Sequence, residues 1–311
     1  MSKYTAVIVT YFPDTQAIEN LERVSTLCDK VIVVDNTPTD IMIPIPQLPN
    51  ITIRKSQGNV GLAAALNQGI QLAGQQGFEN IFLFDQDSRP PDDFFKNMLS
   101  FKSRMDSQVN NCAVYVPNFY DRNSNTFAKF PVLRRFNLTH ATCTDTASGL
   151  HKDAILAITS GSLITCSRYK EIGPLRDDYF IDFIDNEYCL RIDRLGLRIA
   201  VNCDVVLDHA IGKRSIHRFC GLTIKPNNHL PLRRYYISRN GVRTTIDYFS
   251  LYPCYLSLIL ARMIHELFSI VLYEDKKPEK IKALFCGIYH GLIGRMGKCQ
   301  IRSLISSQRQ M

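Results

Sequence analysis

Two carboxylates stand two positions apart at Asp85 and Asp87, directly after the apolar run 81–84 and shortly before Pro90-Pro91. If the chain stays extended, both side chains point to the same side of the backbone. Such a pair can hold hydroxyl groups and a Mg²⁺ or Mn²⁺ ion, because hard cations prefer oxygen ligands and substrate phosphates. A solvated Asp-x-Asp turn has the same residues, so the pair alone is weak evidence for a site.

The run before these carboxylates is the fourth in a series of apolar segments that predict strands; the first three are residues 6–10, 31–34 and 51–53. Apolar residues at helical spacing predict helices over residues 15–28 and from about 62 to a C-cap at Gly77. Apolar strands that alternate with helices predict an α/β fold with a mostly parallel sheet and helices on both faces.

The second half of the chain continues this domain and then changes character. Further strands are expected at residues 112–117, 154–166 and 198–206, with a polar loop over 118–153 and a helix over 182–195. After about residue 216, clustered Arg and Tyr precede apolar helices with basic residues between them. We therefore expect a main domain of residues 1–215 and a C-terminal helical extension of residues 216–311.

The composition is that of a globular protein, with 45% hydrophobic and 21% charged residues. The excess of 37 Lys and Arg over 29 Asp and Glu suits an anionic partner but is too diffuse to indicate nucleic acid. The N-terminal segment lacks the pattern of a signal peptide, and the ten cysteines show no metal-binding spacing. We therefore expect a cytoplasmic protein with reduced thiols.

Three of the predicted strands end in polar residues, at Thr10-Tyr11, Asp35-Asn36 and Asp85-Gln86-Asp87. Ligands of open α/β sheets bind at the carboxyl ends of the strands. A single acid after a strand is more often a turn former or a helix cap. Three such ends in one sheet favour a ligand site.

Four segments, VIVTYFPD, VVDN, NVGLAAALNQGI and FLFDQDS, resemble in order and spacing the nucleotide-sugar domain of family 2 glycosyltransferases. Residues 159–162 resemble the acceptor-side strand of that family, residues 179–191 (YFIDFIDNEYCLR) its catalytic acid helix and residues 208–212 its closing histidine loop. The form YFIDFIDNEYCLR, followed by RRYYISRN at 233–240, is most similar to the bacterial rhamnosyltransferase branch. The resemblance covers residues 4 to about 240 and implies the GT-A fold, a Rossmann-like single domain.

The resemblance also implies roles for the residues at the strand ends. Those that would bind the nucleotide sugar are Thr10 and Tyr11 in the nucleoside pocket, Asp35 at the pyrimidine base, Asn59 and Gly61 at the nucleotide floor, and Asp85 at the ribose or the metal. The metal ligands would be Asp87 and His209, and the ion Mg²⁺ or Mn²⁺. A lone histidine is otherwise more often structural.

Inversion at an anomeric carbon needs one carboxylate to take the proton of the attacking hydroxyl. Asp185 is the implied base because it takes the register of the family's aspartate, although Ile184 replaces the usual Glu before it. On a helix, Asp182 and Asp185 would share a face, so that one could catalyse and the other position the acceptor. The expected acceptor-side residues are Ser160, Gly161, Asp182 and Glu187. A plain polar helix surface is the alternative for the three acids.

Basic residues follow the histidine loop. Lys213, Arg214, His217 and Arg218 form a loop that either closes over the diphosphate or is merely solvated. Arg233, Arg234 and Arg239, with Tyr235 and Tyr236 between them, either bind an acceptor phosphate or anchor the chain at an anionic membrane face.

No run of eighteen uncharged apolar residues predicts a transmembrane helix, and the nearest candidate, residues 248–261, is short for a span. The tail helices are either interfacial and amphipathic or packed on the core.

Together these features predict an inverting, metal-dependent glycosyltransferase. The resemblance implies transfer of L-rhamnose from dTDP-rhamnose to a lipid-linked glycan in O-antigen-like polysaccharide assembly, in the cytoplasm or peripherally at the cytoplasmic face of the inner membrane. The alternatives are a hexosyltransferase that uses a UDP-sugar and a non-catalytic nucleotide-binding protein of the same fold.

Overall fold

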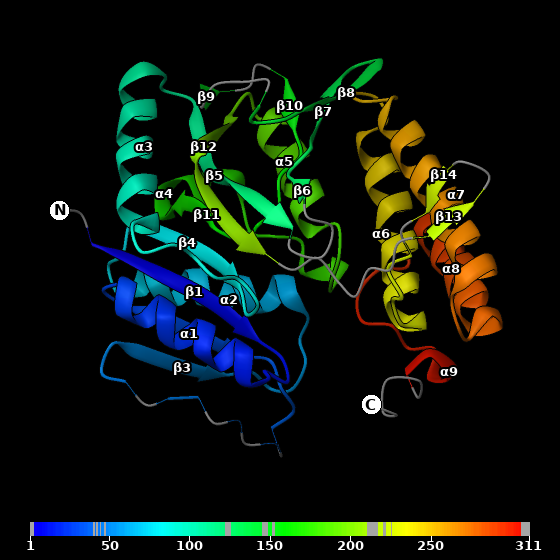
Figure 1. Cartoon of the computed structure of the whole chain (residues 1–311), viewed down its shortest axis with the longest axis horizontal. Helices are drawn as coiled ribbons and strands as arrows, with labels where there is room; N and C mark the ends of the chain where they lie inside the picture. The colour runs from blue at the N-terminus through cyan, green and yellow to red at the C-terminus, as the bar shows by residue number, and fades with distance from the viewer. Residues whose placement is uncertain are drawn as a thin grey trace.

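The computed structural model describes residues 3–39, 41, 43, 45–46, 48–121, 126–144, 149–150, 153–209, 217–219, 222–224 and 226–305. A central mixed sheet has the strand order β3-β2-β1-β4-β11-β5-β12-β9, and β6 pairs with β5 (Figure 1). Its strands are β1 (Tyr4–Thr10), β2 (Val31–Asp35), β3 (Ile51–Lys55), β4 (Asn80–Asp85), β5 (Cys112–Asp121), β6 (Thr126–Phe127), β9 (Gly149–Leu150), β11 (Ser162–Thr165) and β12 (Arg198–His209).

Strands β3, β2, β1 and β4 run parallel, as do β5 and β12, while β11 lies antiparallel between β4 and β5. Two smaller sheets are formed by β10 (Ala154–Ile155), β7 (Phe130–Arg134) and β8 (Asn137–Ala141), and by β13 (His217–Phe219) with β14 (Leu222–Ile224). The helices around the main sheet are α1 (Thr15–Leu27), α2 (Leu62–Gln75), α3 (Phe94–Gln108), α4 (Cys166–Ile172), the short 3₁₀ helix η1 (Asp177–Tyr179) and α5 (Ile184–Arg194).

The alternation of side chains along β1 explains why helices cover both faces of the sheet. Ala6 and Ile8 join a buried cluster with residues of α1 and α3, whereas Val7 and Val9 join a cluster with residues of α2 and α5. All four side chains are buried. The predicted α/β fold, with a mostly parallel sheet between two helical layers, is therefore confirmed.

The C-terminal extension, expected to be helical, begins with strands β13 and β14 and continues with α6 (Pro231–Tyr248), α7 (Tyr255–Tyr273), α8 (Lys277–Leu292) and α9 (Arg302–Ile305). Figure 1 shows α6, α7 and α8 together on the side of the molecule opposite α3. Helix α7 begins seven residues after the segment 248–261 was expected to start, and it is long and apolar enough to cross a membrane by length and composition alone. The boundary between residues 215 and 216 stays a prediction.

Several expectations for individual segments are wrong. The strand expected over 154–166 is two strands, because residues 156–161 form a loop, and helix α4 already begins at Cys166. The polar loop over 118–153 contains the β7–β8 hairpin. Cys143 and Cys203, 60 residues apart, form a disulfide, so the expectation of wholly reduced thiols fails at this pair.

Candidate functional site

Strand register brings three of the predicted site residues to one edge of the sheet. Thr10 of β1 pairs with Asp35 of β2, and the neighbouring Val9 pairs with Asp85 of β4. Parallel strands end at the same edge, so the three polar residues lie side by side at the carboxyl end of the sheet. This is the edge where the sequence placed the ligand site.

Asp35 is almost fully buried at this edge and is a strong hydrogen-bond acceptor. Its carboxylate accepts hydrogen bonds from the hydroxyl of Thr10 (3.4 Å) and the backbone N–H of Thr37 (2.9 Å), and it pairs with the ammonium of Lys55 (2.6 Å). The carboxylate therefore fixes the ends of β1, β2 and β3 to one another. Lys55 is a site residue that sequence reasoning missed, because no local pattern signals a partner twenty residues away.

Asn36 joins this edge to the loop that carries Asn59 and Gly61. Its side-chain amide donates to Asn59 Oδ1 (3.1 Å) and to the carbonyl of Gly61 (3.2 Å), and its oxygen accepts from the N–H of Val60 (2.9 Å). Gly61 has φ of +92°, and a Cβ there would lie 2.7 Å from the carbonyl oxygen of Phe180. Only glycine permits this close approach.

The side chain of Ser160 supports the turn after β4. The Ser160 hydroxyl accepts a hydrogen bond from the N–H of Asp85 (3.2 Å) and lies 2.5 Å from the hydroxyl of Ser88. Gly161 donates its N–H to the carbonyl of Leu83 (2.7 Å). Ser160 and Gly161 were expected on the acceptor side, and the structure places both against the turn that carries Asp85 and Asp87.

The last residues of β12 lie beside the same turn. The N–H of Arg89 donates to the carbonyl of Asp208 (3.2 Å), so the backbone of His209 ends close to the Asp85–Asp87 segment. The side chain of His209 and the basic loop at Lys213 and Arg214 lie outside the described residues. Tyr11 is exposed beside this turn, where its N–H donates to Gln86 Oε1 (2.8 Å).

Within the described part of the chain, no three His, Cys, Asp or Glu side chains are grouped to hold a metal. Mg²⁺ and Mn²⁺ do not require such a cage at a phosphate site, since Mg²⁺ keeps several waters and takes one or two carboxylates plus phosphate oxygens. The carboxylates of Asp85 and Asp87 at the strand edge fit that kind of donor set.

Asp185 lies in the first turn of α5 and lines a cavity together with mostly apolar side chains that include Ile70, Leu83 and Tyr188. Burial among them raises the pKa of the Asp185 carboxyl to about 6. The carboxylates of Asp182 and Asp85 raise this pKa as well, and the N–H of Asn186 lowers it by donating a hydrogen bond of 2.8 Å. Asp185 and Leu83 of β4 line the same cavity, so the first turn of α5 lies close to the end of the strand that carries Asp85.

The raised pKa of Asp185 predicts the pH dependence of a reaction in which it is the base. Below about pH 6 the carboxyl holds a proton and cannot accept one, so kcat/KM of the free enzyme should fall there tenfold for each pH unit. Asp182→Asn removes a charge that raises this pKa, so its acid limb should move to lower pH. A kcat/KM profile that stays flat through pH 6 in the wild type would contradict the assignment.

Asp182 is not part of α5, contrary to the expectation that it shares a helical face with Asp185. The helix begins at Ile184, and the residues before it bend sharply: φ is +68° at Phe180, +63° at Asp182 and +64° at Phe183. Left-handed backbone is strained for such residues and persists only where the surroundings fix it. We call residues 178–183 the base loop, because it leads directly into Asp185.

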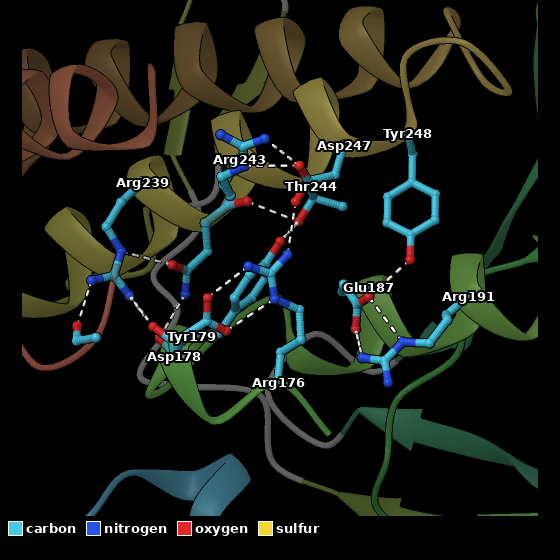
Figure 2. A network of polar contacts seen from close by, with 12 residues as sticks. Arg176, Asp178, Tyr179, Glu187, Arg191, Arg239, Arg243, Thr244, Asp247 and Tyr248 are labelled. Carbon is cyan, nitrogen blue, oxygen red and sulfur yellow. Dashed lines mark hydrogen bonds and ion pairs between the residues drawn. The ribbon is translucent and has the colours of Figure 1, made fainter. Parts of the chain in front are cut away.

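Helix α6 supplies the contacts that fix the base loop. The amide of Asn240 donates to the carbonyls of Tyr179 (2.9 Å), Ile181 (2.8 Å) and Asp182 (2.9 Å). Arg239 donates to the carbonyls of Asp178 (3.2 Å) and Tyr179 (2.9 Å), and the Tyr179 hydroxyl bonds to Thr244 (Figure 2). Both Arg239 and Asn240 are fully buried. The segment RRYYISRN thus positions the loop before the base.

Removal of the Asn240 amide should loosen this loop. Asn240→Ala leaves three buried or part-buried carbonyls without that donor, which we expect to cost about 1–3 kcal/mol of unfolding free energy. The transfer activity per folded molecule should also fall, because the base loop no longer holds Asp182 and Asp185 in place. Urea unfolding and kcat of the folded fraction measure the two effects. The exposed Asn137→Ala on β8 is the control, and equal behaviour of the two variants would refute the positioning role.

Glu187 is held in a different cluster from the acceptor side that was expected for it. Its carboxylate pairs with Arg191 one turn along α5 and accepts a hydrogen bond from the hydroxyl of Tyr248 on α6 (2.8 Å) (Figure 2). It is buried, and these contacts tie α5 to α6. They give Glu187 a structural role, and Asp185 is left as the acid of α5 that faces the strand edge.

The three arginines of the segment 233–240 have different surroundings. Arg234 and Arg239 are buried and engaged within the protein, so the expectation that they bind an acceptor phosphate or a membrane is wrong for these two. Arg233 is exposed and pairs with Asp182 (3.1 Å), whose charge raises the pKa of Arg233 most, and the charges of Asp85 and Asp87 raise this pKa to a smaller extent. It is the cation of this segment that faces the site.

His229 also lies in this region and had no signal in the sequence. Burial and, to a smaller extent, the charge of Arg233 lower its pKa to about 3, so the imidazole is neutral at physiological pH. A neutral ring beside Asp182 and Arg233 can exchange hydrogen bonds without adding charge to the site.

The sheet edge carries acids at the ends of its strands, the position where open α/β sheets bind their ligands. The family model described as glycosyl transferase family 2 matches residues 8–162. The dTDP-rhamnosyl transferase RfbF of Shigella flexneri is 31% identical over 248 residues, which are 77% of this chain and 79% of that protein. The chain therefore belongs to glycosyl transferase family 2 and is a glycosyltransferase.

Solved structures support the fold. S. aureus TarS residues 1–349 in complex with UDP-GlcNAc has a TM-score of 0.54 and 16% identity, over 94% of this chain and 82% of that one. GalNAc-T7 with UDP, GalNAc and Mn²⁺ has a TM-score of 0.52 and 13% identity, over 70% of this chain and 44% of that one. These likenesses confirm the predicted GT-A type of α/β fold.

Proposed function

We propose that this glycosyltransferase is inverting and transfers L-rhamnose from dTDP-rhamnose to a lipid-linked glycan during O-antigen-like polysaccharide assembly in the cytoplasm. The proposed donor is supported by the 31% identity to a protein named dTDP-rhamnosyl transferase, over most of both chains. The observation that supports the chemistry is the Asp185 carboxyl at the start of α5, which lines a largely apolar cavity and whose pKa is raised to about 6 by burial there.

In the proposed reaction an acceptor hydroxyl attacks the anomeric carbon of the donor while Asp185 takes its proton. The bond from that carbon to the diphosphate oxygen breaks, and the nucleoside diphosphate leaves with the electron pair. Attack from the side opposite the leaving group inverts the anomeric configuration. The pKa of about 6 keeps most of the Asp185 carboxyl ionised at neutral pH while leaving it basic enough to accept a proton.

The diphosphate would lie at the strand edge, opposite Asp185. Asp85 and Asp87, with His209, would hold a Mg²⁺ or Mn²⁺ ion, which supplies Lewis-acid stabilisation of the leaving group when bound. Thr10, Tyr11 and Asp35 would line the nucleoside pocket, and Asn59 and Gly61 its floor. Arg233 adds a positive charge near the same carboxylates. Asp182 would position the acceptor, and Ser160 would position the turn after β4 that carries Asp85 and Asp87.

Thermal unfolding in the presence of different nucleotide sugars tests the donor. Since a ligand stabilises the folded state according to its concentration relative to Kd, dTDP-rhamnose with Mn²⁺ should raise Tm more than UDP-GlcNAc or UDP-glucose does. Chelation of the metal should remove most of the shift. A larger shift with a UDP-sugar would favour the alternative, a hexosyltransferase that uses UDP-sugars.

A further inference from the structure

The outer face of α7 exposes a row of large apolar side chains. Leu256, Leu260, Ile264 and Phe268 follow one another at four-residue spacing and are 39% to 56% exposed. Residues four apart lie on the same side of a helix, so the row forms one continuous stripe. Val271 and Leu272 extend it to the end of the helix. Single exposed apolar residues are ordinary, but a stripe of this length indicates a surface that another body covers.

Helix α8 carries a second stripe. Phe285, Tyr289, Leu292 and Ile293 are 55% to 60% exposed and again recur at three- and four-residue spacing. Figure 1 shows α7 and α8 packed beside each other on the outer side of α6, away from the main sheet. We call the two stripes together the apolar face of the extension.

The charge of the chain is concentrated in the region that carries the apolar face. Residues 226–311 contain 13 Lys and Arg and 5 Asp and Glu, whereas residues 1–225 contain 24 of each. The formal net charge of +8 therefore equals the net charge of residues 226–311. Lys276, Lys277 and Lys282 are exposed where α7 passes into α8.

We propose that the apolar face of α7 and α8 docks on the surface of an anionic lipid bilayer. Exposed apolar stripes beside basic residues are typical of helices that lie in the membrane interface. Each Lys or Arg near an anionic leaflet adds to the attraction. A second copy of the chain fits less well, because a symmetric contact through this face would bring together two regions that each carry the whole positive charge of the molecule.

The opposite side of α7 shows that the helix lies on the membrane and does not cross it. Glu266, Ser269 and Ile270 are buried there against the protein, and Glu266 forms an ion pair with the fully buried Arg234 of α6. A spanning helix would have to expose this carboxylate to lipid. A helix with one side buried against the protein and one exposed apolar side is typical of helices that lie in the membrane interface.

The proposed docking would also bring a lipid-linked acceptor to the base, and this consequence rests on the function proposed above. Arg262 of α7 lies over the ring of Phe183, with 4.9 Å between guanidinium carbon and ring centre. Phe183 is two residues before Asp185, and the charge of Arg262 lowers the pKa of Asp185. The helix that would touch the bilayer therefore borders the site itself.

Co-sedimentation with lipid vesicles tests the surface without any sugar transfer. The full chain should bind vesicles of phosphatidylcholine containing about 30% phosphatidylglycerol, and bind pure phosphatidylcholine vesicles at least about tenfold more weakly. The double variant Leu260→Ser/Ile264→Ser should lose at least about tenfold in binding to the anionic vesicles. Ile53→Ser, on the edge strand β3 and 43% exposed, is the matched control and should bind like the wild type.

The other possible results contradict either the docking surface or the proposed function. Wild-type protein that ignores anionic vesicles, or a double variant that binds them as well as the wild type, would remove the docking surface. A concentration-dependent dimer in analytical ultracentrifugation that the double variant abolishes would assign the face to a second copy. The donor-induced Tm shift of each variant reports separately on the sugar-transfer site, so vesicle binding without donor binding would refute the proposed function and leave the surface standing.

Discussion

Asp185→Asn should abolish sugar transfer while leaving the protein folded and able to bind its nucleotide. An amide cannot take the proton of the acceptor hydroxyl, so we expect kcat to fall by about 100- to 10,000-fold. The two side chains have nearly the same shape, and the amide of the variant carries no charge to be desolvated inside a largely apolar pocket. Transfer of labelled sugar under saturating donor measures the loss.

The stability of this variant provides the control. Burial raises the pKa of Asp185 to about 6, so its ionised form is disfavoured in the folded state, and that penalty grows as pH rises from the unfolded pKa through 6. Asp185→Asn should therefore be at least as stable as the wild type at pH 8. Wild-type rates in a stable Asp185→Asn protein would show that another group is the base, with Asp182 the next candidate.

Arg234→Met should be the most destabilising single change in the extension. The guanidinium is fully buried and pairs with Glu274 (2.5 Å) and Glu266, and Glu274 is also paired with Lys280 (2.8 Å). Removal of this guanidinium leaves the buried carboxylates of Glu266 and Glu274, and of the three ion pairs only that between Lys280 and Glu274 remains. Breaking a buried ion pair in this way costs about 3–5 kcal/mol, which urea unfolding would detect as a lower midpoint.

The neighbouring Arg233→Met is the matched control, since it makes the same chemical change one position earlier. Arg233 is exposed, so the loss of its surface ion pair with Asp182 should cost at most about 1 kcal/mol of stability. It faces Asp85 and Asp87, and its removal should reduce transfer by about tenfold or more. Equal stability of the two variants would contradict the account of this segment.

The strand edge of the site could be predicted from sequence because it depends on local patterns. Apolar runs that end in polar residues gave the positions of Thr10, Asp35 and Asp85, and parallel register brought them together as expected. Their partners were harder to predict. Lys55 reaches Asp35 from the next strand, and Ser160 supports Asp85 across a separation of 75 residues.

The approach to Asp185 could not be predicted, because tertiary contacts decide its backbone. Helical periodicity includes Asp182 in α5, but Asn240 and Arg239 hold the preceding carbonyls in a left-handed bend that no local propensity favours. The same contacts explain why the arginines of RRYYISRN were misassigned. The sequence shows three arginines around two tyrosines, whereas the burial of Arg234 and Arg239 depends on the contacts of α6 with α7 and with the base loop.

The most direct test of the central claim is the product formed from dTDP-rhamnose, Mn²⁺ and a lipid-linked saccharide acceptor, analysed by mass spectrometry and proton NMR. The account predicts an acceptor that gains one deoxyhexose with inverted anomeric configuration, and no such product with Asp185→Asn. Retention of configuration, or transfer from a UDP-sugar and none from dTDP-rhamnose, would contradict it.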